Sequence, residues 1–338
     1  MRALRRDGFT LVELLVVIGI IALLISVLLP ALSIAKEQAN KVKCAGNLRS
    51  IGQGLQLYAT DYKGTFPASY IYAGMVISGN SQTPNAAVNG YVHWSSFLYG
   101  DKSKSGPGIF QSTVGWDALQ CPSVQSGGLS PTNTFPANLQ DGQVNETDGV
   151  VDQMSPRCSY TLNEAICPRN KFVLGFQTAV RIYTYVNTGK VKNSGGTILA
   201  TEFNSDWHIV AGASNTGSGG MVCKSHRPVH GFIAFAGSGD GTACDADQWA
   251  PTFGGRGYAY QKCTINQISP TVVPGSCLSR LDWVGRNHGT GSPGKKLSNF
   301  LYLDGHVETH HISETIATGN FMWGDKFYSI SPNDDGTP

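Results

Sequence analysis

The sequence predicts an α+β protein in which one long N-terminal helix, transmembrane in its first half, packs on an antiparallel β-sheet with large irregular loops. Two observations lead to this prediction. An apolar run opens the chain and passes into a stripe of apolar residues with helical spacing. The remainder has no second long apolar run, and short β-like segments alternate there with stretches rich in Gly, Ser, Asn and Pro.

The apolar run extends from Phe9 to Leu29, and Glu13 is its only charged residue. As a helix that rises about 1.5 Å per residue, the run is roughly 31 Å long, enough to cross the hydrocarbon core of a bilayer. A carboxylate inside such a run is costly, so Glu13 is a candidate functional residue. Basic residues at positions 2–6 favour a cytoplasmic N-terminus, although further basic residues follow the run.

Beyond the run, we expect residues 30–64 to continue the helix as an amphipathic segment. Pro30 should kink or loosen it, because proline lacks the backbone N–H of a regular turn. Gly64 and the following Pro67 predict its C-terminal end. The apolar positions that recur every three to four residues are Ala35, Val42, Ala45, Leu48, Ile51, Leu55, Tyr58 and Tyr62.

Residues 65–338 form the predicted β-rich body. Strands are expected within Tyr91–Leu98, Thr197–Phe203 and Leu297–Ile312, among others. Charged residues make up 14% of the chain and the formal net charge is +2, with no basic patch that contains interleaved aromatic residues. These features argue against a nucleic-acid partner. No motif of a hydrolase or a phosphate-binding loop is present, so we do not expect an enzyme.

The N-terminal segment Arg6–Ile18 reads RDGFTLVELLVVI. It resembles the N-terminal motif of type IV pilins and type II secretion pseudopilins. The resemblance implies a leader peptide of residues 1–8, cut after Gly8 by a prepilin peptidase, and methylation of Phe9 as the new N-terminus. It also implies that residues 9–29 form an assembly helix in which Glu13 acts, with copies of the subunit and an inner-membrane assembly platform as partners.

Physical chemistry agrees with the role that the resemblance gives to Glu13. A new ammonium at Phe9 of one subunit could pair with the Glu13 carboxylate of a neighbour in a medium of low dielectric constant, which fixes the register between helices. The alternative is that Glu13, close to the helix end, snorkels to the lipid headgroups.

Other landmarks resemble a family of pilin-like proteins abundant in planctomycetes. They are residues 47–55, 61–67, 119–123 and 158–163. That family carries near its C-terminus a His, nine residues and then Asp-Gly. The matching residues here are His288, Asp304 and Gly305, although residues 289–303 make the intervening segment longer than in the family.

The body contains residues suited to two kinds of cation site. In an unbroken strand, His306, Glu308 and His310 would share one face and could bind a divalent metal, unless Asp304-Gly305 turns the strand into a hairpin. Acidic loops with Asp240, Asp245 and Asp247, and with Asp334 and Asp335, would suit structural calcium. A solvated strand face and polar turns are the alternatives, and no other cofactor is expected.

The chain contains eight cysteines, and a membrane-targeted N-terminus favours disulfides in an oxidising compartment. Eight cysteines allow 105 pairings, so the sequence does not define the connectivity. The shortest loops would join Cys158 with Cys167, Cys223 with Cys244, and Cys263 with Cys277. Buried free thiols are the alternative.

The resulting hypothesis is a pilin-like structural subunit of a type IV pilus-like or type II secretion filament. It would be a single-pass membrane protein with an extracytoplasmic body before assembly, and part of a periplasmic or surface filament afterwards. Two alternatives remain. One is a membrane-anchored module that binds glycans or other substrates and does not polymerise. The other is an enzyme secreted on a signal peptide cut after Ala35.

Overall fold

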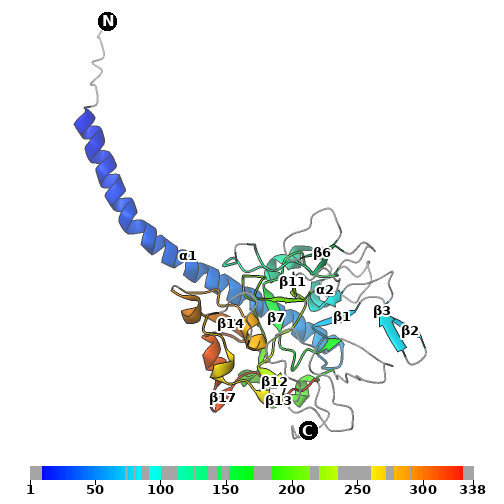
Figure 1. Ribbon diagram of the computed structural model, residues 1–338. Coiled ribbons are helices and arrows are strands. Elements are labelled where there is room, and N and C mark those ends of the chain that lie inside the picture. Colours follow the sequence, from blue (N-terminus) through cyan, green and yellow to red (C-terminus); the bar gives the residue numbers. More distant parts are fainter. Residues whose placement is uncertain are drawn as a thin grey trace.

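The computed structural model describes most of the chain, and one helix dominates its shape. The residues described are 10–72, 75–78, 81–84, 91–99, 113–124, 126–134, 143–145, 152–170, 185–213, 221–234, 260–271, 278–289 and 291–329. The helix α1 (Leu11–Asp61) projects from a β-rich body and passes into it with its C-terminal half (Figure 1). The α+β fold expected from the sequence is confirmed.

The ends of α1 follow local rules. Thr10 is the N-cap: its hydroxyl accepts a hydrogen bond from the Glu13 backbone N–H (3.3 Å), and its own N–H donates to the Glu13 carboxylate (2.9 Å). This reciprocal pair is a capping box. At the other end Gly64, at φ 81°, donates its N–H to the Ala59 carbonyl (2.6 Å), as expected of a glycine that ends a helix. The helix continues through Pro30 and curves gently, without a sharp break (Figure 1).

A four-stranded antiparallel sheet lies at the centre of the body, in the order β15-β14-β9-β7. Its strands are β7 (Tyr160–Leu162), β9 (Ile198–Glu202), β14 (Ser298–Tyr302) and β15 (Val307–His310). The predicted strand Leu297–Ile312 is therefore a hairpin. Gly305, at φ 95°, forms its turn because a residue with a side chain is strained in that conformation.

The two faces of this sheet pack into two hydrophobic clusters. Along β14, Leu301 belongs to the cluster that contains Leu48 and other buried residues of α1, whereas Phe300 and Tyr302 belong to the opposite cluster with Trp323. This is the alternation expected of a strand that is buried on both sides. Gly52 of α1 lies against Leu301, which allows the helix to approach the sheet closely.

The remaining elements surround this centre. The expected strand Tyr91–Leu98 is only partly correct, because the chain turns into a short helix at Trp94. The shorter elements are α2 (Trp94–Tyr99), β1 (Tyr70–Tyr72), β2 (Met75–Ser78), β3 (Ser81–Pro84), β4 (Tyr91–His93), β5 (Asn133–Thr134), β6 (Val144–Asn145), β8 (Arg169–Asn170), β10 (Ala211–Ala213), β11 (Met221–Cys223), β12 (Phe232–Ala234), β13 (Tyr260–Lys262), β16 (Ile316–Ala317), β17 (Asn320–Phe321), and the 3-10 helices η2 (Thr113–Leu119), η4 (Thr188–Lys190), η5 (Ser194–Gly196), η6 (Ile265–Gln267), η7 (Arg280–Trp283), η8 (Pro293–Lys295) and η9 (Ile312–Thr315).

Candidate functional site

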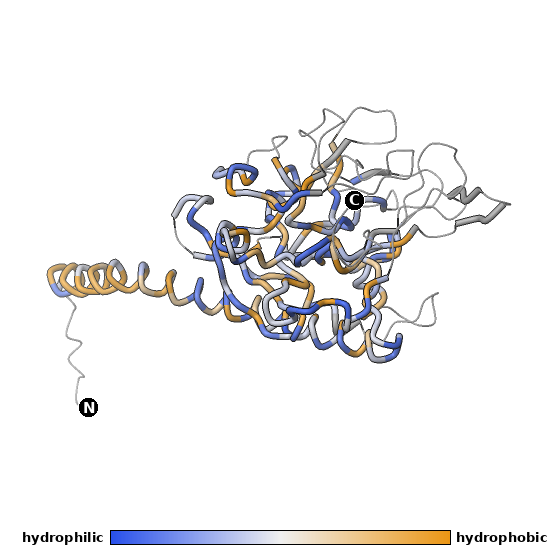
Figure 2. Tube along the Cα trace, turned by 90° about the horizontal axis from the view of Figure 1, so that it is seen from below, coloured by the Kyte–Doolittle hydropathy of each residue, from blue (hydrophilic) through white to orange (hydrophobic). Residues whose placement is uncertain are grey.

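The outer half of α1 is the most exposed apolar element among the residues described. Its large apolar side chains are 45–74% exposed from Leu11 to Ile34, and none is packed on the body. Figure 2 shows this half as an almost continuous hydrophobic helix that projects from a body of mixed polarity. The helix is long and apolar enough to cross a membrane by length and composition. Glu13 is exposed there and caps its own helix, a role that the sequence analysis did not consider.

The inner half of α1 presents a buried stripe to the body. Five apolar side chains of this stripe are at most 3% exposed: Cys44, Leu48, Ile51, Leu55 and Ala59. Val42, which was expected to belong to the stripe, is 65% exposed, so the buried stripe begins at Cys44. Polar contacts add to the packing: the Gln56 amide donates to the Leu303 carbonyl (2.8 Å).

A disulfide between Cys44 and Cys121 joins α1 to the body. It differs from the three pairs with the shortest loops. The pairing of Cys158 with Cys167 is wrong, because both are free and buried, as are Cys223 and Cys263. Cys244 and Cys277 lie outside the described residues. Burial raises the pKa of the Cys158 thiol to about 12, which keeps it protonated and unreactive.

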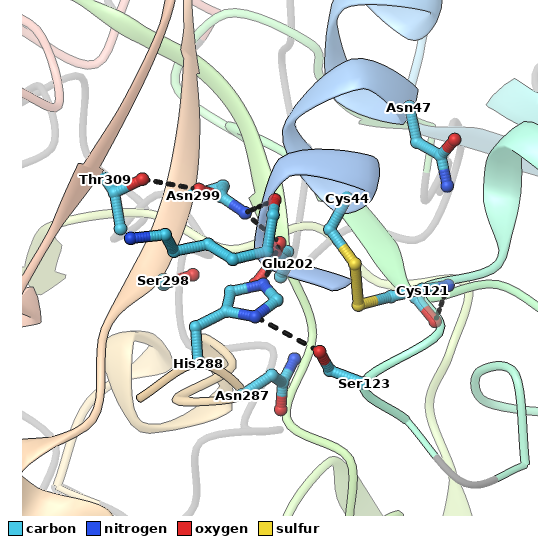
Figure 3. A network of polar contacts seen from close by, with 12 residues as sticks. Cys44, Asn47, Cys121, Ser123, Glu202, Asn287, His288, Ser298, Asn299 and Thr309 are labelled. Atoms are coloured by element: carbon cyan, nitrogen blue, oxygen red, sulfur yellow. Dashed lines mark hydrogen bonds and ion pairs between the residues drawn. A yellow bond between two sulfur atoms is a disulfide. The ribbon is translucent and has the colours of Figure 1, made fainter. Parts of the chain in front are cut away.

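Beside this disulfide lies a buried polar cluster, which we call the His288 network. It consists of His288, Glu202, Asn299, Ser123 and Glu37 (Figure 3 labels the first four). The carboxylate of Glu202, at the end of β9, accepts hydrogen bonds from His288 Nε2 (2.9 Å) and from the Asn299 amide (2.9 Å). On the other side of the imidazole, Nδ1 lies 3.2 Å from the Ser123 hydroxyl and 3.5 Å from Glu37 of α1.

The electrostatics of the network follow from the burial of its central pair, His288 and Glu202. His288 and Glu202 are both 0% exposed. Burial alone lowers the pKa of His288, but the hydrogen bond and the charge of Glu202, together with Glu37, outweigh it, so that the pKa is raised. Glu37 also accepts a hydrogen bond from the Gly289 backbone N–H (3.0 Å). The network therefore connects α1, the central sheet and the segment that carries His288.

The residues of the C-terminal motif, His288 and Asp304-Gly305, lie in two separate places. His288 lies in this network, whereas Asp304 lies at the hairpin turn, where its carboxylate contacts His306 Nδ1 at 2.5 Å. No hydrogen bond or ion pair joins His288 to Asp304 in the described structure. Sequence reasoning missed the partners that His288 does have, because they come from segments far apart in the chain.

The predicted metal ligands His306, Glu308 and His310 lie on and beside β15, partly exposed. Glu308 lies between the two imidazoles, 3.8 Å from His306 Nε2 and 2.8 Å from His310 Nε2. Glu314 contacts the other nitrogen of His310 at 2.9 Å. Metal binding at these three residues stays a prediction. The acidic loops considered for calcium, like Gly8 and Phe9, lie outside the described residues.

Comparison with known proteins places the N-terminus in a recognised class. Residues 4–29 match the prokaryotic N-terminal methylation motif. The match and the exposed apolar helix together indicate the precursor of a type IV pilin-like or pseudopilin protein, which is a membrane-anchored class processed by prepilin peptidase. No curated protein and no solved structure matches the chain.

Proposed function

We propose that this chain is a pilin-like structural subunit that is cut between Gly8 and Phe9 and then polymerises through the outer half of α1. The observation that carries the proposal is the combination of the methylation motif with a helix whose outer half contacts no other part of the described body. An extracytoplasmic body, a cytoplasmic N-terminus before cleavage and assembly by an inner-membrane platform are parts of this proposal. The C-terminal landmarks favour the planctomycete-type branch.

Burial of apolar surface would stabilise the filament once the outer half of α1 has left the bilayer. Each large apolar side chain that passes from an exposed to a buried position contributes roughly 1.5–3 kcal/mol in water. In a bilayer that contribution is absent, so packing and specific polar pairs decide which helices associate there. Glu13 is the only ionisable residue from Leu11 to Ala35, which makes it the natural partner for the Phe9 ammonium of a neighbouring subunit.

Mass spectrometry of the mature N-terminus tests the processing step. We expect N-methylated Phe9. A chain that retains Met1 would instead favour the non-polymerising anchor, and a chain that begins at Lys36 would favour secretion. Both of these outcomes would contradict the proposal.

Two substitutions test the role of Glu13 in assembly. Glu13→Gln should abolish incorporation into filaments while the body stays folded, because the pair with the ammonium is lost. Thr10→Ala is the matched control: it removes one half of the capping box but keeps the carboxylate, so it should still assemble. Equal incorporation of Glu13→Gln and wild type would contradict the register mechanism.

A cavity of about 660 Å³ favours a second role for the body, the binding of a neutral polar ligand such as a glycan. Its lining combines uncharged polar residues, among them Asn193 and Asn320, with apolar ones, and the Lys262 ammonium lies over the ring of Phe321, 4.9 Å from its centre. Polymerisation and this binding are compatible. A glycan-binding assay with wild type and with Phe321→Ala would detect it as binding that the substitution removes.

A further inference from the structure

We propose that the reduced form of this chain binds one zinc ion at the position of the Cys44–Cys121 disulfide, with Cys44, Cys121, His288 and Glu202 as ligands. The structure shown here, with the disulfide formed, is then the oxidised form of the same site. The inference does not depend on whether the subunit polymerises.

The proposal starts from a convergence of four ligand groups. The two sulfurs, a nitrogen of His288 and a carboxylate oxygen of Glu202 all lie within 4.8 Å of one another. They come from α1, the segment after η2, the end of β9 and the segment before β14. All four residues are 0% exposed. Figure 3 shows the imidazole pointing to Glu202, with the disulfide beside it.

The chemistry of this set suits zinc. Zinc prefers four ligands in a tetrahedron, drawn from thiolate sulfur, imidazole nitrogen and carboxylate oxygen. With the usual bond lengths, the nitrogen and oxygen ligands would lie about 3.4 Å apart and the two sulfurs about 3.8 Å apart. His288 Nε2 and Glu202 Oε1 are already 2.9 Å apart. The main change is the opening of the sulfur pair, with shifts of roughly 1 Å elsewhere.

A second observation points to a ligand at this place. The oxygen Oε2 of Glu202 is buried and has no hydrogen-bond partner among the described residues. A buried carboxylate oxygen left without a partner is unfavourable, and such an atom calls for an explanation. A zinc ion bound by the two reduced sulfurs and by the Glu202 carboxylate, in place of the disulfide, would supply the missing partner.

The surroundings of His288 resemble the outer shell of a zinc site. Nδ1 contacts the Ser123 hydroxyl and the Glu37 carboxylate, which leaves Nε2 as the nitrogen for the metal. A metal-bound histidine usually donates its other N–H to a carboxylate or a comparable acceptor, which fixes the ring orientation. Asn299 would hold Glu202 in the same way through its amide.

The two forms interconvert by a balanced exchange. In the zinc form the ion is held by two thiolates, neutral His288 and ionised Glu202. A disulfide-type oxidant accepts two electrons from the thiolates, the Cys44–Cys121 bond forms, and Zn²⁺ leaves. The oxidant becomes two thiols and takes up two protons from solvent. Oxidation would thus replace a metal link between α1 and the body with a covalent one.

The test uses the full chain in detergent, produced in a host without its periplasmic thiol oxidant and purified with a phosphine reductant. Thiol labelling after denaturation verifies that Cys44 and Cys121 are reduced. We expect one zinc per reduced chain by elemental analysis after a weak chelator is applied, and none in the oxidised chain. Cobalt in place of zinc should give thiolate charge-transfer and tetrahedral absorption bands.

Variants identify the ligands. Cys44→Ser and Glu202→Gln should each remove the retained zinc, and Glu37→Gln should weaken zinc affinity by roughly 10- to 100-fold, as outer-shell changes do. Cys263→Ser is the matched control, since Cys263 is buried and free but lies outside the network; it should retain zinc. Because Glu202→Gln keeps the side-chain shape, a folded Glu202→Gln chain shows that lost zinc is not lost folding. No zinc in the reduced wild type, or zinc retained by all ligand variants, would overturn the proposal.

Discussion

The two halves of α1 contain apolar side chains of the same kind but place them in opposite surroundings. Leu24, in the outer half, is 57% exposed, whereas Leu48, in the inner half, is 0% exposed. The inner stripe is covered by the body of the same chain. The outer half has no such cover within the described structure, and we expect lipid or neighbouring helices to supply it. Apolar composition alone therefore does not distinguish a folding core from an assembly surface.

Removal of the disulfide should have the largest effect, and only on the inner half. The bridge closes a sequence separation of 77 residues, for which chain entropy predicts a contribution of about 4–5 kcal/mol. We expect the double variant Cys44→Ala/Cys121→Ala to lose this much unfolding free energy for the body, measured by tryptophan fluorescence in denaturant. Far-UV circular dichroism should show that the outer half stays helical in detergent. A loss below about 1 kcal/mol would contradict the chain-entropy account.

A pair of leucine substitutions compares the halves directly. Leu48→Ala should cost the body about 2–5 kcal/mol of unfolding free energy, because it leaves a cavity in a packed core. Leu24→Ala should leave that quantity unchanged and instead weaken association between subunits. Chemical denaturation measures the first effect, and cross-linking between subunits the second. If Leu24→Ala lowered the unfolding free energy as much as Leu48→Ala, the outer half would also be part of the folded core.

Acid should destabilise the body, which covers the inner half of α1. Burial lowers the pKa of His93 to about 3, so between about pH 6.5 and pH 3 the unfolded chain binds a proton at His93 that the folded chain does not. His93 therefore lowers stability as the pH falls through this window, by about 1.4 kcal/mol per pH unit. His93→Gln should flatten the profile by that slope, measured by denaturation between pH 7 and pH 4. If His93→Gln left the slope of unfolding free energy against pH unchanged, another group would cause the acid sensitivity.

Two glycines within α1 give the smallest effect, with opposite signs. A Cβ on Gly52 would meet Leu301 Cδ1 at 2.9 Å, whereas a Cβ on Gly46 would meet no atom within 4 Å. Gly46→Ala should stabilise the helix by about 0.5–1 kcal/mol, since glycine is the poorer helix former. Gly52→Ala should destabilise by about 1 kcal/mol or more, because the clash with the core exceeds that gain. Thermal denaturation of both variants provides the comparison.

Local rules predicted much of the fold. The apolar run, the glycine that ends α1 and the strand within Thr197–Phe203 follow from spacing and residue type. The capping box could also have been found, because Thr10 and Glu13 have the expected spacing. The hairpin at Asp304-Gly305 was one of two alternatives, and only the three-dimensional structure decides between them.

The candidate site was harder to predict from the sequence than the fold. The His288 network depends on which distant segments the fold brings together, and single-sequence patterns contain no signal for that. The same holds for Cys44–Cys121: its partners lie 77 residues apart, while shorter loops offered pairs that do not form. Trp94 begins a helix where a strand was expected, because its buried ring packs in the core beside α1.

The bridge also determines how the subunit would bear mechanical load. A pull on the N-terminal end of α1 travels along the helix to Cys44 and crosses the sulfur–sulfur bond to Cys121. The loop between them, which contains the whole buried stripe after Cys44, lies outside that path. A filament under tension would strain the exposed rod and one covalent bond first, while the buried stripe of α1 after Cys44 would remain shielded.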